Sequence, residues 1–267
     1  YPYGLFTHVG GYTSALIQRA AGCLPVASAD PRETALEHEA VAAALGADVS
    51  LDPSAAVVGW YLDELWPAVR GQLARIEVAG PARQDAAEAL AQFRQASAGH
   101  LAYADGAVRL SEHDPEAEGR LLAHAEWVDA QLERCTTVDW TELTHFTPDP
   151  VPDRFAPWLA PLDLAKARGV ALWSDDAGLR SLATQAGVPS FGTVALLKVL
   201  ADRGVISAEQ QLAAERALRE EYAVDLPLDM DWMRESAARM GWETGPAAFQ
   251  FCRPATWANE RAARAAF

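Results

Sequence analysis

The sequence predicts an α/β fold in which a parallel sheet is flanked by helices, with a helical leader before it and a helical extension after it. Short apolar runs alternate with stretches of helical spacing, for example around residues 49–51, 76–78 and 171–173. A chain of 267 residues that is 50% hydrophobic can bury a large core. We expect the divisions to fall so that residues 1–46 form the leader, 47–205 the sheet domain and 206–267 the extension.

In the first part of the chain, helices and strands are expected to follow one another in a regular order. Their ranges are helix 14–21, helix 32–45, strand 49–51, helix 55–65, strand 76–78 and helix 82–96. Gly46 ends the second helix, and Ser54 is the candidate cap of the third. Gly80 and Pro81 break the second strand.

A β-hairpin is expected next, because two β-prone runs within 100–113 flank Asp105-Gly106, a dipeptide that strongly favours a tight hairpin turn. The ranges that follow are helix 115–133, strand 135–138, a proline-rich loop at 146–153, and then helix, strand, helix, strand and helix from 162 to 204. Ser207 and Gln210 form a capping box at the start of another helix, and further helices are expected near Met230 and Thr256.

The net charge of the chain limits the classes of function that it can have. The chain has 37 acidic against 22 basic residues and a net charge of −15, which argues against non-specific coating of nucleic acid. A nuclease stays compatible with this charge, because catalytic carboxylates are part of the count and bound metal reverses the local sign.

The cysteines and the hydropathy suggest a cytoplasmic protein that does not bind membranes. The thiols Cys23, Cys135 and Cys252 have neither zinc-site nor disulfide-framework spacing. No membrane-spanning apolar stretch or signal peptide is evident. Because the chain starts at Tyr1 rather than Met, we expect it to be part of a longer polypeptide with further domains.

Acidic residues gather where the predicted strands end. Asp52 directly follows the first strand, and Asp175 and Asp176 follow the apolar run at 170–173. Parallel strands present their carboxyl ends at one edge of a sheet, so these residues can converge there. Asp85 and Asp163 lie at helix starts from which they can reach the same crevice. Such an oxygen-only cluster suits Mg²⁺ or Mn²⁺, which can activate water for phosphodiester cleavage.

Each of these acids also has a structural explanation. Asp52 can cap a helix or form a turn, and one residue of the Asp175-Asp176 pair can cap the next helix while the other coordinates metal. Asp85 can belong to a solvated helix face, and Asp163 can stabilise a helix dipole. The joint pattern supports a metal site more strongly than any single residue does.

These residues resemble the PIN-domain nuclease family over about residues 48–204. Residues 51–55 look like that family's opening strand with its Asp-x-Ser junction, and residues 172–193 look like its late Thr/Ser-x-Asp strand and the segment that follows. Members of the family are mostly metal-dependent ribonucleases, including toxins of toxin–antitoxin pairs and accessory domains of larger regulatory or defence proteins.

The resemblance implies that Asp52 and Asp176 ligate Mg²⁺ or Mn²⁺, and that Asp85 stands where the family usually has Glu or Asp. Asp175 is then a helix cap or a supporting group. Asp163 precedes Asp176 by 13 residues, a shorter spacing than the family's, which requires a shortened or rearranged helix. The candidate catalytic residues are Asp52, Asp85, Asp175 and Asp176, the candidate metal ligands are Asp52, Asp85, Asp163 and Asp176, and Thr193 is the candidate cofactor contact.

The implied function is that of a metal-dependent ribonuclease acting as the effector domain of a larger protein, with RNA as substrate and the oligomeric state open. A catalytically weak PIN-like docking or regulatory module is the alternative, which the net charge and the displaced Asp163 favour.

Overall fold

Five parallel strands form the central sheet of the protein. The computed structural model describes residues 11–18, 26–28, 30–95, 99–104, 107–112, 115–140, 143–146, 157–223, 226 and 229–250. Across the sheet the strands follow the order β5 (Thr136–Val138), β2 (Arg75–Ala79), β1 (Asp48–Leu51), β6 (Ala171–Trp173) and β7 (Ser190–Phe191). The predicted α/β class and the predicted strands are confirmed.

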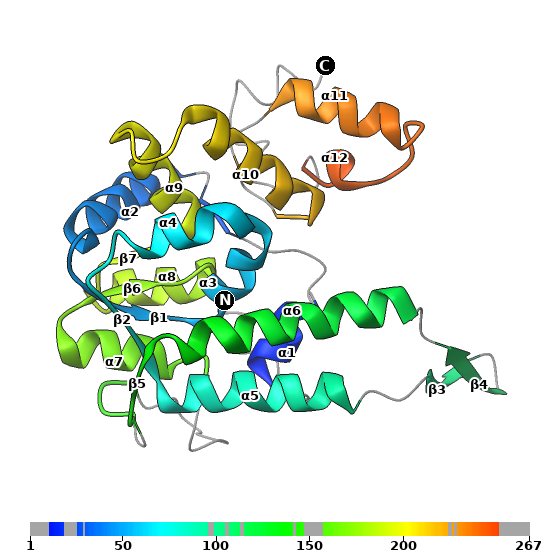
Figure 1. Cartoon of the computed structure of the whole chain (residues 1–267), viewed down its shortest axis with the longest axis horizontal. Coiled ribbons are helices and arrows are strands. Elements are labelled where there is room, and N and C mark those ends of the chain that lie inside the picture. The colour runs from blue at the N-terminus through cyan, green and yellow to red at the C-terminus, as the bar shows by residue number, and fades with distance from the viewer. Residues whose placement is uncertain are drawn as a thin grey trace.

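Helices cover both faces of this sheet. In the view of Figure 1, α5, α6 and α7 lie below the strands and α2, α4 and α9 lie above them. Residues of β1 and β6 are accordingly buried on both faces, as is usual in parallel sheets. The helices up to the last strand and directly after it are α1 (Tyr12–Ile17), α2 (Pro31–Ala44), α3 (Pro53–Gly59), α4 (Trp66–Arg70), α5 (Gly80–Arg94), α6 (Pro115–Glu133), α7 (Ala160–Arg168), α8 (Ala177–Gln185) and α9 (Thr193–Asp202).

Two predicted elements differ from the observed ones. The helix expected at 55–65 is divided into α3, a 3-10 segment at Trp60–Leu65 and α4. Gly80 and Pro81 begin α5 rather than merely ending a strand, because proline is tolerated in the first turn of a helix, where its missing N–H has no partner to lose.

The predicted hairpin is present: β3 (Gly99–Ala104) and β4 (Ala107–Glu112) pair antiparallel between α5 and α6. The capping box at Ser207 and Gln210 is also confirmed, at the start of α10 (Ala208–Glu220). Helices α11 (Met230–Arg239) and α12 (Pro246–Phe249) follow. The helix expected near Thr256, and residues 147–153 of the predicted loop, lie outside the described residues.

The leader helices pack into the main core. Tyr12, Leu16 and Ile17 of α1 and Val41 of α2 belong to the same buried cluster as the strands β1 and β2. Helix α1 lies against α3 and α5. The divisions at residues 46 and 205 remain a prediction.

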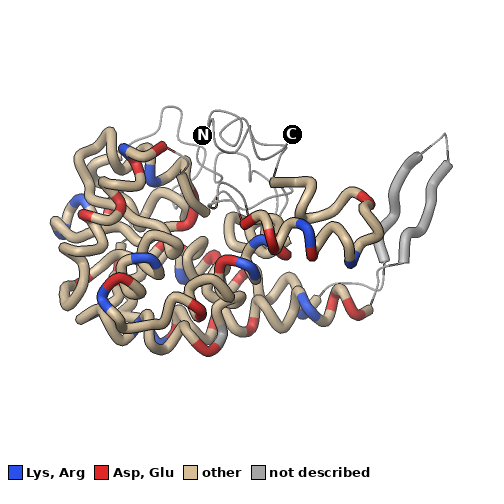
Figure 2. The backbone as a smooth tube through the Cα atoms, turned by 90° about the horizontal axis from the view of Figure 1, so that it is seen from above, with Lys and Arg blue, Asp and Glu red and all other residues tan. Residues whose placement is uncertain are grey.

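Charges of both signs are distributed over the described helices, as Figure 2 shows. None of the described helices is long and apolar enough to cross a membrane.

Candidate functional site

The sheet order brings the carboxyl ends of β1 and β6 together. From β1 the chain builds the sheet outward through β2 and β5 on one side, whereas β6 and β7 lie on the other side. The edge between β1 and β6 is therefore a topological switch point, which is where open α/β sheets bind ligands. The N–H of Asp52 donates to the carbonyl of Trp173 at 2.9 Å, so the residues that follow the two strands are neighbours.

The carboxylate of Asp52 is fully buried at this edge, and only one of its two oxygens accepts hydrogen bonds from the described residues. Oδ2 accepts hydrogen bonds from the Ser54 N–H at 3.1 Å, the Ser174 hydroxyl at 3.0 Å, the Tyr12 hydroxyl at 3.1 Å and the Ser54 hydroxyl. Oδ1 is buried and has no hydrogen-bond partner among the described residues. An unpartnered buried carboxylate oxygen is costly, and a cation is the partner that would offset this cost.

Asp52 interacts electrostatically with Asp176. The pKa of Asp52 is raised to about 7: burial and the negative charge of Asp176 raise it, and the hydrogen bonds from Ser54, Ser174 and Tyr12 oppose this rise. A carboxylate whose pKa is raised by the charge of a second acid is suited to share one divalent cation with it, because the cation removes their repulsion.

Ser54 ties the two strand ends together. Its hydroxyl donates to Asp52 and accepts hydrogen bonds from the N–H groups of Asp175 at 2.9 Å and Asp176 at 3.1 Å. The expected role of Ser54 as the helix cap is wrong: Asp52 is the N-cap of α3, because it is the last extended residue, and Ser54 lies inside the first turn.

Of the adjacent acids, one caps a helix, as predicted, but it is Asp176 rather than Asp175. Asp176 is the N-cap of α8, and its Oδ1 accepts from the Leu179 N–H at 3.1 Å. Asp175 instead accepts from the N–H of Thr193 at 2.7 Å and from the Thr193 hydroxyl. Burial raises the pKa of Asp175 to about 6, although the charge of Arg180 lowers it.

Thr193 holds the carboxylate of Asp175 through two hydrogen bonds. Its hydroxyl oxygen also accepts a hydrogen bond from the indole N–H of the fully buried Trp173 at 2.9 Å. Thr193 therefore positions Asp175 in this structure, and contact with a cofactor remains a prediction.

Asp85 is buried and bound to the leader. It accepts hydrogen bonds from the N–H groups of Tyr12 at 3.0 Å and Thr13 at 2.7 Å, the first two residues of α1. Burial raises the pKa of Asp85, and these donors oppose the shift.

Asp163 uses both oxygens to hold Trp140 and residues 144–146. It accepts from the indole N–H of Trp140, the N–H and hydroxyl of Thr144, and the N–H groups of His145 and Phe146. Burial acts to raise the pKa of Asp163, but the hydrogen bonds outweigh it and the pKa is lowered. A carboxylate has about four lone-pair positions, so five donors leave little room for a metal. In the part of the chain that the structure describes, no three His, Cys, Asp or Glu side chains are arranged to hold a metal ion.

We expect Asp163→Ala to destabilise the protein without changing its affinity for Mn²⁺. The substitution leaves several partly buried donors without their acceptor, which costs about 1–3 kcal/mol. Urea unfolding measures the first effect and calorimetric Mn²⁺ titration the second, with Asp139→Ala as the control because Asp139 is exposed. Loss of Mn²⁺ binding in Asp163→Ala alone, with the fold intact, would restore Asp163 to the metal site.

Sequence reasoning missed three groups at this site. Tyr12 comes from the leader, and nothing in its local sequence indicates a partner 40 residues away. The other two are Arg180 and Glu37, a buried ion pair with an N–O distance of 3.0 Å that joins α8 to α2. Ser174 lies within the late motif at residues 172–193, and its position between Trp173 and the acid pair could have indicated that it belongs to the site.

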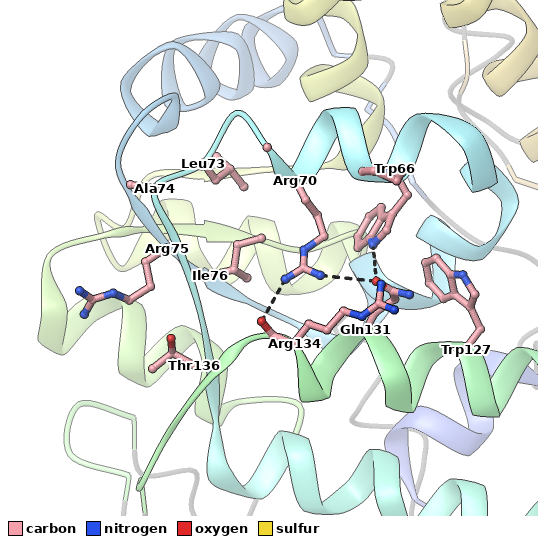
Figure 3. A pocket seen from close by; sticks show the side chains of 12 residues that line it. Trp66, Arg70, Leu73, Ala74, Arg75, Ile76, Trp127, Gln131, Arg134 and Thr136 are labelled. Carbon is pink, nitrogen blue, oxygen red and sulfur yellow. Dashed lines mark hydrogen bonds between the residues drawn. The ribbon is translucent and has the colours of Figure 1, made fainter.

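A separate pocket of about 710 Å³ lies at the other edge of the sheet, where β2 and β5 begin (Figure 3). Three arginines, Arg70, Arg75 and Arg134, line it together with Trp66 and Trp127. No carboxylate is among its described lining residues. The Arg70 guanidinium donates to the Gln131 side chain and the Arg134 carbonyl, and Figure 3 draws both hydrogen bonds.

Comparison with known proteins agrees with this architecture. The model of a family described as "PIN domain associated with the TPR-GreAB-C-PIN system" matches residues 51–185, which is half of the chain and includes Asp52, Asp85, Asp163, Asp175 and Asp176. No curated protein and no solved structure matches. The chain belongs to the PIN-domain family.

Proposed function

We propose that this PIN domain is a ribonuclease that depends on Mg²⁺ or Mn²⁺. The observation that carries the proposal is Asp52, a buried carboxylate at the switch point of the sheet whose Oδ1 has no hydrogen-bond partner among the described residues. Asp176 is near enough to raise its pKa, and both acids are oxygen donors of the kind that hard divalent cations prefer.

In this proposal Asp52 and Asp176 hold the metal, and Asp85 is the third candidate ligand. Bound metal supplies an activated water and stabilises the charge that develops on the phosphodiester. Ser54 and Ser174 orient Asp52 through its Oδ2, which leaves Oδ1 for the metal. Thr193 and Arg180 keep Asp175 in place beside Asp176.

RNA as the substrate is supported by the arginine-lined pocket. In a chain with a net charge of −15, a hollow lined by three arginines and no described carboxylate is a place where a phosphate backbone can bind. The pocket lies where β2 (Arg75–Ala79) and β5 begin, whereas the acid site lies where β1 and β6 end.

The test is cleavage of single-stranded RNA by the purified protein. We expect cleavage with Mg²⁺ or Mn²⁺ and none in EDTA, and at least about a hundredfold loss in Asp52→Asn and in Asp176→Asn. Asp139→Asn is the matched control. In the same assay Arg75→Gln combined with Arg134→Gln should raise KM and leave kcat unchanged. Cleavage that persists in EDTA or in both acid variants contradicts the proposal.

The second candidate is a docking module with little or no catalysis. The finding that favours it is that no three metal-ligating side chains come together within the described residues. This alternative would be established if neither the wild-type protein nor variants that expose the carboxylates of Asp52 and Asp176 to solvent bind Mn²⁺ or cleave RNA.

The description of the matching family names a PIN domain associated with a TPR-GreAB-C-PIN system. We propose that this chain is the effector domain of a larger protein in such a system and that it acts in the cytoplasm, where its RNA substrate is present.

A further inference from the structure

Helix α1 lies directly on the acid site. Its residues Tyr12–Ile17 are all buried, although the helix is only one and a half turns long. It packs against α3, α5 and α6, and Figure 1 shows it beside α5 and α6. A helix of this length is not stable alone, so its contacts with the rest of the domain hold it in place.

Two of the candidate metal ligands are bound by α1. The hydroxyl of Tyr12 donates to Oδ2 of Asp52 at 3.1 Å, and the N–H groups of Tyr12 and Thr13 donate to the two oxygens of Asp85 at 3.0 and 2.7 Å. At Asp85 the two N–H donors occupy both oxygens and compete with a cation for the same lone pairs, whereas at Asp52 the Tyr12 hydroxyl fastens α1 to Oδ2 beside the unpartnered Oδ1.

The backbone before α1 is adapted to this close approach. Gly11 has φ of +89°, a conformation that favours glycine, and a Cβ atom placed there would lie 2.9 Å from Oδ1 of Asp85. The leader therefore fits against Asp85 because this position has no side chain.

Access to the acids is also closed in this arrangement. Asp52 is 0% exposed, Asp176 3% and Asp85 7%. A hydrated cation and a phosphodiester cannot reach these carboxylates in this arrangement, to which α1 contributes its contacts with Asp52 and Asp85.

We propose that α1 is an autoinhibitory plug, which must leave the acid site before divalent metal and RNA can enter. This inference rests on the proposed metal-dependent function. It explains why no three ligands are assembled among the described residues: Asp85 is bound to α1, and its release makes it available to join Asp52 and Asp176.

The test measures Mn²⁺ affinity by calorimetry and amide hydrogen exchange of residues 12–17, both in the full chain. Tyr12→Phe keeps the buried ring and removes the hydroxyl that binds Asp52, and Ala15→Pro removes the hydrogen bond from the Ala15 N–H to Gly11 and disrupts the helix. Tyr222→Phe is the matched control, since Tyr222 packs on Phe249 in the C-terminal extension.

We expect Tyr12→Phe to bind Mn²⁺ about fivefold more tightly than the wild type, because α1 loses one of the hydrogen bonds that hold it on the acid site. Ala15→Pro should bind more tightly still, and Tyr222→Phe should match the wild type. Mn²⁺ should accelerate exchange of the α1 amides in the wild type.

Equal Mn²⁺ affinities in all four proteins, with α1 amides equally protected with and without Mn²⁺, overturn the plug and leave the metal-dependent function standing. If no Mn²⁺ binds even to Ala15→Pro while that variant keeps its fold and exposes α1 to exchange, the metal-dependent function itself is overturned.

Discussion

Replacement of Asp52 by Asn is expected to stabilise the metal-free protein at pH 8 and to remove the stabilisation that Mn²⁺ gives to the wild type. Burial raises the pKa of Asp52 from 3.8 to about 7, so at pH 8 the folded protein carries a buried negative charge that the unfolded chain solvates freely. Asparagine keeps an oxygen for the donors at Oδ2 and carries no charge.

The sign of the pH dependence follows from proton binding. Between about pH 4 and 7 the folded state binds more protons at Asp52 than the unfolded state does, so the free energy of unfolding falls as pH rises through this window. Asp175, with its pKa raised to about 6, acts in the same direction. Asp163, with its pKa lowered, adds stability above its unfolded pKa that is lost on acidification.

Ionisation of the buried Asp52 lowers the free energy of unfolding by an amount on the order of 4 kcal/mol, as an upper limit. The amide that replaces Oδ1 brings N–H donors into a buried position, and a donor that finds no acceptor there reduces the gain by about 1–3 kcal/mol. The net result at pH 8 is a gain of about 1–3 kcal/mol, which disappears below pH 5, where Asp52 is protonated in the wild type.

Urea unfolding in EDTA at pH 5 and pH 8 measures this difference, with Asp139→Asn as the exposed control. Adding Mn²⁺ at a hundredfold excess over its dissociation constant should stabilise the wild type by about 2.7 kcal/mol and leave Asp52→Asn unchanged. If Asp52→Asn is destabilised equally at both pH values, the charge of Asp52 is not what costs stability.

The sequence was sufficient to predict the sheet and the convergence of Asp52 with the Asp175-Asp176 pair at adjacent strand ends. Strand ends are marked locally, by an apolar run followed by Asp52 or by the Asp175-Asp176 pair, and the parallel topology then places these residues at one edge. For the same reason the hairpin and the capping box at Ser207 were predictable from a few neighbouring residues.

Long-range partners were not predictable from local patterns. Both positions of the acid pair suited a helix cap, and the length of β6 decided in favour of Asp176. The hydrogen-bond partners of Asp163 could not be predicted, because they lie in an irregular segment without periodicity. Tyr12 could not be predicted as a site residue, because the sequence pattern around a tyrosine in a short leader helix does not distinguish it from an aromatic residue of the core.

The largest loss of stability is expected from Arg180→Met. Arg180 is 4% exposed and pairs with Glu37, whose other oxygen accepts from the Gly192 N–H at 3.2 Å. The guanidinium also donates to the carbonyls of Ser174 at 2.8 Å and Val26 at 3.2 Å. It therefore joins α8, α2 and the ends of β6 and β7 behind the acid site.

Removing the arginine leaves Glu37 as a buried and uncompensated charge, which typically costs about 3–5 kcal/mol. The pKa of Asp175 should rise further, because burial and the charge of Glu37 raise it while Arg180 lowers it. Urea unfolding of Arg180→Met at pH 8 measures the loss. Arg234→Met serves as the control, since Arg234 forms an exposed ion pair with Asp231.

The double variant Glu37→Gln/Arg180→Met separates the cost of the uncompensated Glu37 charge from the cost of the lost guanidinium hydrogen bonds. The neutral glutamine keeps an acceptor for Gly192 and removes the orphaned charge, so the double variant should recover about half of the stability that Arg180→Met loses. Failure to recover any stability would mean that the guanidinium acts mainly through the carbonyls of Ser174 and Val26. The ion pair would then be secondary to the backbone contacts that fix the strand end next to Asp175 and Asp176.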